Sequence, residues 1–159
     1  MTSAELRLRP PTQEEFEQWL PRAEAAYARE IAESGAMTAE AAAEKAQLDT
    51  ARRFSSGLGS PGQVLFRLMA ADQPVGWLWL NVPAIGGDPL MAWVNDIEVD
   101  PAYQGRGYGR AAVLLAEREA RAHGMTSLGL NVHGQNTVAR SLYDSLGYEV
   151  MTQQMRKPL

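Results

Sequence analysis

Residues 104–109 read Gln-Gly-Arg-Gly-Tyr-Gly, so glycines occupy alternate positions directly before a helix-forming run. A helix begins with unpaired backbone N–H groups and with the positive end of its dipole, and both favour a bound anion. Glycine lacks a Cβ, which lets the backbone come close to that anion. Arg106 and Arg110 add positive charge beside the loop. The stretch therefore predicts a phosphate site, and a turn without any ligand is the alternative.

Two widespread phosphate motifs do not fit this stretch. A dinucleotide fingerprint that starts at Gly105 needs glycine at the position that Arg110 occupies. A P-loop needs the run Gly-Lys-Ser/Thr, which the sequence lacks.

A second group of polar side chains lies further along the chain. Asn136, Arg140 and Tyr143 are four and three residues apart, so they share one face of a helix predicted over 136–146. Another face of that helix is apolar and should pack against a sheet. A helical tyrosine beside a core is often a packing residue whose hydroxyl group is satisfied, and that interpretation stands beside a chemical one.

The elements that position these groups follow from the hydrophobic periodicity. A capping box at Thr12 and Glu15 opens a first helix, and a break is expected near Pro21. Alternating apolar and β-branched residues later predict strands. The expected order is a strand at 6–10, helices at 12–34 and 38–57, two strands within 63–82, a strand at 90–100, a helix at 110–124, a strand at 126–132, a helix at 136–147 and a strand at 148–157.

This order predicts the fold class. A helix separates the strands at 90–100 and 126–132, so these two strands should be parallel, whereas the earlier hairpins should be antiparallel. We expect an α/β (α+β) architecture in a single domain, residues 1–159, with a mixed, mostly antiparallel sheet and helices on both faces.

The composition narrows the class of protein. The chain has 159 residues, of which 45% are apolar and 21% charged, as in a globular domain. A net charge of −4 argues against general nucleic-acid binding. The sequence has no cysteine, which excludes disulfides and a cysteine nucleophile, and its two distant histidines suggest no metal site. The first residues lack a signal-peptide core and no run can span a membrane, so we expect a cytoplasmic protein without a membrane partner.

Two segments carry a resemblance to a known family. The segment VDPAYQGRGYGRAAVLLAE resembles the Gln/Arg-x-x-Gly-x-Gly/Ala signature of the GNAT N-acetyltransferase superfamily, with Gln104, Gly107 and Gly109 at the three signature positions. The later segment NVHGQNTVARSLYDSLGYEV is similar to the second half of the same pattern. Its matching residues are Asn136, Ala139, Leu142, Tyr143, Leu146, Gly147 and Tyr148. The motifs cover residues 90–150, and the remainder agrees in the order of elements.

The resemblance implies a fold and a co-substrate. In that family the central parallel strands splay apart, and acetyl-CoA binds there without a metal. The glycine loop would hold its pyrophosphate, and the strand before it would hold the pantetheine arm. Carried over, the residues that bind acetyl-CoA are Ile97, Glu98, Val99, Gln104, Gly105, Arg106, Gly107, Tyr108, Gly109, Arg110, Asn136 and Arg140. Tyr143 resembles the family's tyrosine near the thioester sulfur, where a phenol can protonate the departing thiolate as a general acid.

The general base has several candidates. Asp96 and Glu98 alternate on one face of their strand, with Trp93, Asn95 and Ile97 on the other face, although a bulge would alter this parity. If their face meets the cleft, either acid could take the proton of an amine. Otherwise Asn95 could hold a water molecule. Both acids could instead serve the structure.

The acceptor site is less defined. Trp77 and Trp79 share a strand face, and they are either core residues or an aromatic wall beside a cationic amine. Tyr27 lies in the region that contacts the substrate in the family. The expected acceptor is a small-molecule amine or a peptide amine, and the expected assembly is a monomer or a homodimer.

The resemblance carried by the two motifs implies an N-acetyltransferase that moves an acetyl group from acetyl-CoA to a primary amine by direct attack in a ternary complex. An acetyl-CoA-binding sensor or interaction domain of the same fold, with little or no turnover, is the alternative from another class. Transfer of a larger acyl group is a narrower alternative.

Overall fold

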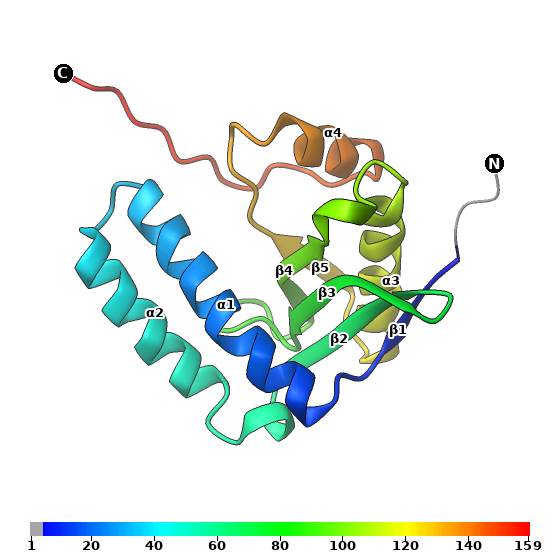
Figure 1. Ribbon diagram of the computed structural model, residues 1–159. Coiled ribbons are helices and arrows are strands. Elements are labelled where there is room, and N and C mark those ends of the chain that lie inside the picture. The colour runs from blue at the N-terminus through cyan, green and yellow to red at the C-terminus, as the bar shows by residue number, and fades with distance from the viewer. Residues whose placement is uncertain (1–4) are drawn as a thin grey trace. The chain divides into compact units, whose positions relative to one another are not determined.

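The computed structural model describes residues 5–159 and contains five strands and four α-helices within them (Figure 1). The elements are β1 (Leu6–Arg9), α1 (Gln13–Glu33), α2 (Ala39–Arg53), η1 (Gly57–Gly59), β2 (Gln63–Ala70), β3 (Gln73–Asn81), β4 (Met91–Val99), η2 (Pro101–Tyr103), α3 (Tyr108–Ala122), β5 (Ser127–Leu130) and α4 (Thr137–Ser145). The chain divides after Gly129 into two compact units, and each is described by itself.

The sheet follows the chain order β1-β2-β3-β4-β5. The pairs β1–β2, β2–β3 and β3–β4 are antiparallel. The sheet is mixed, so its parallel pair is β4 and β5, the two strands that α3 connects. The predicted crossover and the mostly antiparallel sheet are therefore confirmed.

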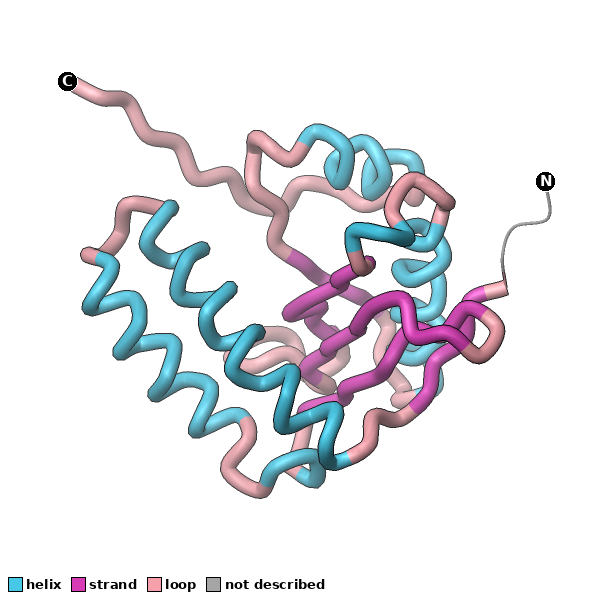
Figure 2. Tube along the Cα trace, viewed as in Figure 1, coloured by secondary structure: helices cyan, strands magenta, loops and turns pink. Residues whose placement is uncertain are grey.

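Helices cover both faces of the sheet in the first unit. The pair α1 and α2 lies on one face and α3 on the other (Figures 1 and 2). The apolar side of α3 is buried through Ala112, Val113 and Ala116.

An aromatic core joins α1 to the sheet. Trp19 of α1 stacks on Trp77, with ring centroids 5.4 Å apart, and meets Trp79 edge-on at 5.4 Å. Trp77 and Trp79 keep only 3% and 7% of their surface exposed. These two tryptophans are therefore core residues, and they do not form an aromatic wall for a substrate, because α1 and Phe54 cover the face that they share.

The beginning of α1 is held by the capping box that the sequence predicts. The amide of Glu15 donates to the Thr12 hydroxyl at 3.2 Å, and the Thr12 amide donates to the Glu15 carboxylate at 2.8 Å. The carboxylate also pairs with Arg9 at 2.6 Å. The Arg9 hydrogen bond, opposed by burial, lowers the pKa of Glu15 to about 2. These bonds tie α1 to the end of β1.

Two of the predicted boundaries are wrong. The helix α1 continues through Pro21 without a break, because its neighbours in the aromatic core hold both halves in one helix. Residues 148–157 form no strand and carry no regular secondary structure. The local sequence alone did not supply the partner strand that a ladder requires.

Among residues 5–159, none of the helices combines the length and the apolar character that crossing a bilayer requires.

Candidate active site

An extra residue in β4 determines which side chains face α1. Trp79 pairs with Asp96, whereas Leu80 pairs with Val94, so Asn95 is the additional residue of a β-bulge. Directly opposed residues of two strands share a face. Asp96 therefore lies on the helix-covered face with Trp79, and Glu98 lies there with its partner Trp77.

The bulge corrects the simple alternation predicted for β4. Trp93 pairs with Asn81, two residues from Trp79, and thus lies on the helix-covered face as well. Asn95 also points to this side, because its Oδ1 accepts hydrogen bonds from Arg53 at 3.1 Å and from Asn81 at 3.4 Å. Of the three residues expected opposite the acids, only Ile97, the partner of Leu78, keeps that position. The β-bulge at Asn95, which the sequence analysis left as a possibility, moves Trp93 and Asn95 to the face of the two acids.

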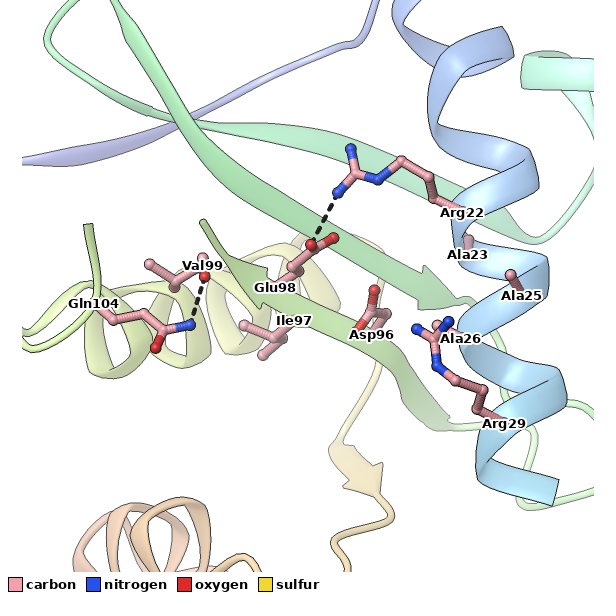
Figure 3. Close-up of a pocket in the computed structure, with 10 residues that line it drawn as sticks. All are labelled: Arg22, Ala23, Ala25, Ala26, Arg29, Asp96, Ile97, Glu98, Val99 and Gln104. Carbon is pink, nitrogen blue, oxygen red and sulfur yellow. Dashed lines mark hydrogen bonds and ion pairs between the residues drawn. The ribbon is translucent and has the colours of Figure 1, made fainter. Parts of the chain in front are cut away.

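A cavity of about 450 Å³ lies between α1 and the second half of β4 (Figure 3). On the strand side it is lined by residues 96–99 and by Gln104. On the helix side it is lined by Arg22, Ala23, Ala25, Ala26 and Arg29. The three alanines leave room that longer side chains would fill. A cavity of this size fits a small organic ligand.

Asp96 lines the cavity with a carboxyl group whose pKa is raised there. Burial raises the pKa of its carboxyl group to about 7, and the negative charges of Glu98 and Glu30 act in the same direction. Arg22 and the amide of Ile97 oppose this shift. A carboxyl group with a pKa near neutrality exchanges protons readily at physiological pH, which makes Asp96 suited to general acid–base chemistry.

Glu98 has a different environment in the same cavity. Its Oε1 accepts a hydrogen bond from Arg22 Nη2 at 3.0 Å, and both side chains are more than one-third exposed. This ion pair joins α1 to β4 across the cavity (Figure 3). The two candidate bases are therefore unequal, since Glu98 is paired with a cation and Asp96 lies where ionisation is unfavourable.

The glycine loop connects β4 to α3 in an open conformation. Gly107 is the N-cap of α3 with φ of +82°, and Gly105 has φ of +73°. A Cβ at either position would meet no atom within 4 Å, so the space beside this backbone is open. The Gln104 side chain donates to the Val99 carbonyl at 3.0 Å and closes the turn. The first amides of α3 have no partner within the helix.

The side chains of the loop are arranged unevenly. Arg106 donates to the Ala102 carbonyl at 3.1 Å and lies over the Tyr103 ring at 5.5 Å, so its charge stays beside the loop. Arg110 is exposed, whereas the Tyr108 side chain is buried and anchors the beginning of α3. Of the residues predicted to contact phosphate, Tyr108 can therefore offer only its backbone amide.

The strand before the loop extends beyond β5. The Thr126 amide donates to the Leu90 carbonyl at 2.8 Å, and Gly129 lies against Trp93. The four residues of β5 thus run beside the first half of β4. Within the part of the chain that the structure describes, no strand pairs with that edge of Ile97 to Val99. Backbone groups of this edge can bind an extended ligand, as the resemblance predicts.

The remaining predicted residues lie in α4 or away from the cavity. Asn136 caps α4, its Oδ1 accepting from the Ala139 amide at 3.1 Å. Arg140 lies 3.4 Å from the Gly134 carbonyl, and the Tyr143 ring packs against Tyr148 at 5.5 Å. Tyr27 donates to Asp49 at 3.1 Å between α1 and α2 and does not line the cavity.

Sequence reasoning missed Arg22 and Arg29. Their spacing of seven residues places both on one helical face, a signal that was present in the sequence. Nothing local indicated that this face meets β4, so the two arginines could not be linked to Asp96.

Comparison with known proteins gives consistent matches. A model of the "Acetyltransferase (GNAT) family" matches residues 16–148. The chain is 31% identical over 160 residues to the uncharacterized N-acetyltransferase YycN of Bacillus subtilis (strain 168), which covers 97% of this chain and 99% of that protein. A crystal structure of YycN matches with a TM-score of 0.86 at 29% identity, over 98% of this chain and 99% of that one.

A more distant structure shares the fold alone. AAC(6')-Iy, in complex with the bisubstrate analogue CoA-S-monomethyl-acetylneamine, matches with a TM-score of 0.62 at 16% identity over 98% of each chain.

Proposed function

Because the chain belongs to the GNAT acetyltransferase family, we propose that it transfers an acetyl group from acetyl-CoA to a primary amine by direct attack, with Asp96 as the general base. The observation that carries this proposal is the position of Asp96. Its carboxyl group, with a pKa raised to about 7, lines a cavity beside the strand that leads into the glycine loop. An acceptor in that cavity would lie next to a base suited to neutral pH.

The residues of the loop fit acetyl-CoA as the donor. When bound, acetyl-CoA supplies an acetyl group activated as a thioester. The amides of residues 104–110 would hold its pyrophosphate, because the left-handed Gly105 and Gly107 leave open space where side chains would otherwise stand. Arg106 and Arg110 would add charge, and the backbone of residues 97–99 would hold the pantetheine arm. The resemblance also assigns Asn136 and Arg140 to the binding of acetyl-CoA.

The chemistry requires a base and an acid. An alkyl amine with a pKa near 10.4 is only about 0.04% neutral at pH 7, so the ammonium proton must be removed before attack. Asp96 accepts the proton of the ammonium group, and the neutral nitrogen then forms the C–N bond. As the C–S bond breaks, Tyr143 donates its phenolic proton to the leaving thiolate, and the second proton that the nitrogen loses on becoming an amide restores the phenol. The sequence has no cysteine that could carry an acyl group, which favours attack by the amine itself.

Binding of the donor gives the first test. Acetyl-CoA at about 100 times its dissociation constant should stabilise the folded protein by about 2.7 kcal/mol, seen as a rise in Tm by scanning fluorimetry. A panel of amines, read by release of free CoA, should then give turnover. A protein that binds neither acetyl-CoA nor CoA contradicts the proposal. Stabilisation without release across the panel would instead indicate a sensor, and acyl-CoAs of increasing length would reveal a larger donor.

Tyr143→Phe tests the general acid. The substitution removes one hydroxyl group and keeps the ring that packs against Tyr148. We expect kcat to fall by about tenfold to a hundredfold, at or below the usual range for proton transfer, because a thiolate is already a good leaving group. Acetyl-CoA affinity, measured by calorimetry, should change little. Tyr148→Phe is the matched control, and an equal loss in both variants would argue against an acid at Tyr143.

A further inference from the structure

Two arginines border the alanine wall of the cavity. Arg22 and Arg29 are seven residues apart on α1, which separates them by about 10 Å along the helix. Between them, the short side chains of Ala23, Ala25 and Ala26 line the same space. Figure 3 shows the guanidinium group of Arg29 extending from α1 toward Asp96.

The two arginines differ in their partners. Arg22 is paired with Glu98 at 3.0 Å. Within residues 5–159, Arg29 forms no ion pair. A guanidinium group carries five N–H donors in a planar fork that matches a carboxylate. The charges of the cavity lining can therefore be sorted into one internal pair, Arg22 with Glu98, and two groups left for a ligand, Arg29 and Asp96.

We propose that Arg29 binds a carboxylate of the acceptor, so that the acceptor is a small molecule with both an amine and a carboxylate, such as an amino acid. This inference rests on the proposed acetyl transfer. The amine lies at Asp96, the carboxylate lies at Arg29, and the body of the molecule packs against the alanine wall of Ala23, Ala25 and Ala26. A ligand with one charge of each sign matches the one cation and the one carboxyl group that the lining leaves for it.

A simple cationic amine fits the same lining less well. It would find Glu98 already paired with Arg22, and it would leave Arg29 without a carboxylate partner. The volume of about 450 Å³ also suits a molecule of amino-acid size better than a folded polypeptide. The acceptor is thus selected by two groups of opposite charge.

Pairs of amines that differ only in the carboxylate test this inference. Phenylalanine with phenethylamine, and tyrosine with tyramine, are compared by kcat/KM from CoA release. The wild type should prefer the carboxylated member by about tenfold or more, as charge-assisted hydrogen bonds partly screened by water allow. Arg29→Gln should abolish the preference, and Arg29→Lys should keep part of it. Arg52→Gln, on α2 and outside this cavity, should leave it unchanged.

The outcomes separate the carboxylate site from the reaction. A wild type that treats both members alike, or an Arg29→Gln variant that loses both equally, overturns the role of Arg29 while acetyl transfer stands. Binding of phenylalanine to the CoA-saturated protein, measured by calorimetry, gives a second readout that needs no turnover. Binding to the wild type but not to Arg29→Gln, without any CoA release, would support the carboxylate site and contradict the proposed transfer. Absence of such binding, together with no preference in turnover, overturns the inference.

Discussion

Replacing Asp96 with asparagine is expected to lower kcat by about 10²- to 10⁴-fold, the range that general base catalysis contributes. The amide keeps the size of the side chain but cannot accept the proton of an attacking amine. Acetyl-CoA affinity should stay within a few-fold of the wild type, because the glycine loop is untouched. Glu98→Gln is the matched control, since this carboxylate is paired with Arg22, and its effect on kcat should be much smaller. A larger loss of kcat in Glu98→Gln than in Asp96→Asn would instead identify Glu98 as the general base.

The pH dependence gives an independent measure of the same group. A base with a pKa of about 7 must be ionised to act, so kcat/KM should fall as the pH decreases below 7. This decrease of kcat/KM below pH 7 should be absent from the residual activity of Asp96→Asn. If the same decrease of kcat/KM persists in that variant, it belongs to the titration of another group.

Stability separates a catalytic defect from a folding defect. The pKa of Asp96 is raised in the folded state, so the folded protein binds this proton more tightly than the unfolded chain does. The free energy of unfolding should therefore decrease as the pH rises from about 4 to about 7. A shift to about 7 corresponds to at most about 4 kcal/mol, and to about half of that after solvent screening of a half-buried group. Asp96→Asn should be the more stable protein at pH 8, by urea denaturation, and should lose that advantage near pH 4.

Gly76→Ala is expected to cause the largest loss of stability. A Cβ at Gly76 would lie 2.0 Å from the Glu98 carbonyl oxygen and 3.1 Å from the Val99 Cα atom, and both belong to the backbone. The strands β3 and β4 would have to separate there, so we expect the free energy of unfolding to fall by about 3 kcal/mol or more. Gly59→Ala is the control, because an added Cβ there meets no atom within 4 Å. Equal urea midpoints for the two variants would contradict the close approach.

The same substitution should also weaken donor binding. Gly76 pairs with Val99, the last residue of the backbone segment assigned to the pantetheine arm. Any fraction of Gly76→Ala that remains folded should bind acetyl-CoA more weakly than Gly59→Ala does, as measured by calorimetry below the Tm of both variants. Unchanged affinity would show that this end of β4 does not contact the donor.

Local signals in the sequence predicted the parts of the fold that depend on neighbouring residues. The capping box of Thr12 and Glu15 begins α1, because the Thr12 side chain bonds to a backbone amide three residues later. The cap that Asn136 forms on α4 was not predicted, since the sequence analysis placed Asn136 within the helix. The glycine loop was predicted at the beginning of the next helix, because alternate glycines directly precede a helix-forming run. The GNAT fold, with its mixed sheet, followed from the order of these elements and from the two motifs.

Contacts between distant segments were not predictable in this way. The bulge at Asn95 is defined by pairing with β3, and the burial of Trp77 depends on Trp19, far away in the sequence. The environment of Asp96 combines β4 with α1, so its raised pKa could not be read from its neighbours in the chain. Residues 148–157 were predicted as a strand from their composition, but strand formation depends on a partner that the local sequence cannot supply.

The bulge at Asn95 also has a consequence for how such a site can arise or disappear. Between Trp93 and Asp96, β4 has two residues where its partner β3 has one, and Asn95 is the extra residue. A gene that lost this codon would keep Trp93 and Asp96 on the same face, because the remaining residues would resume regular alternation. It would lose the local bend and the added twist that a bulge gives a strand. A single-codon insertion or deletion would therefore reshape the cleft while leaving the aromatic core in register.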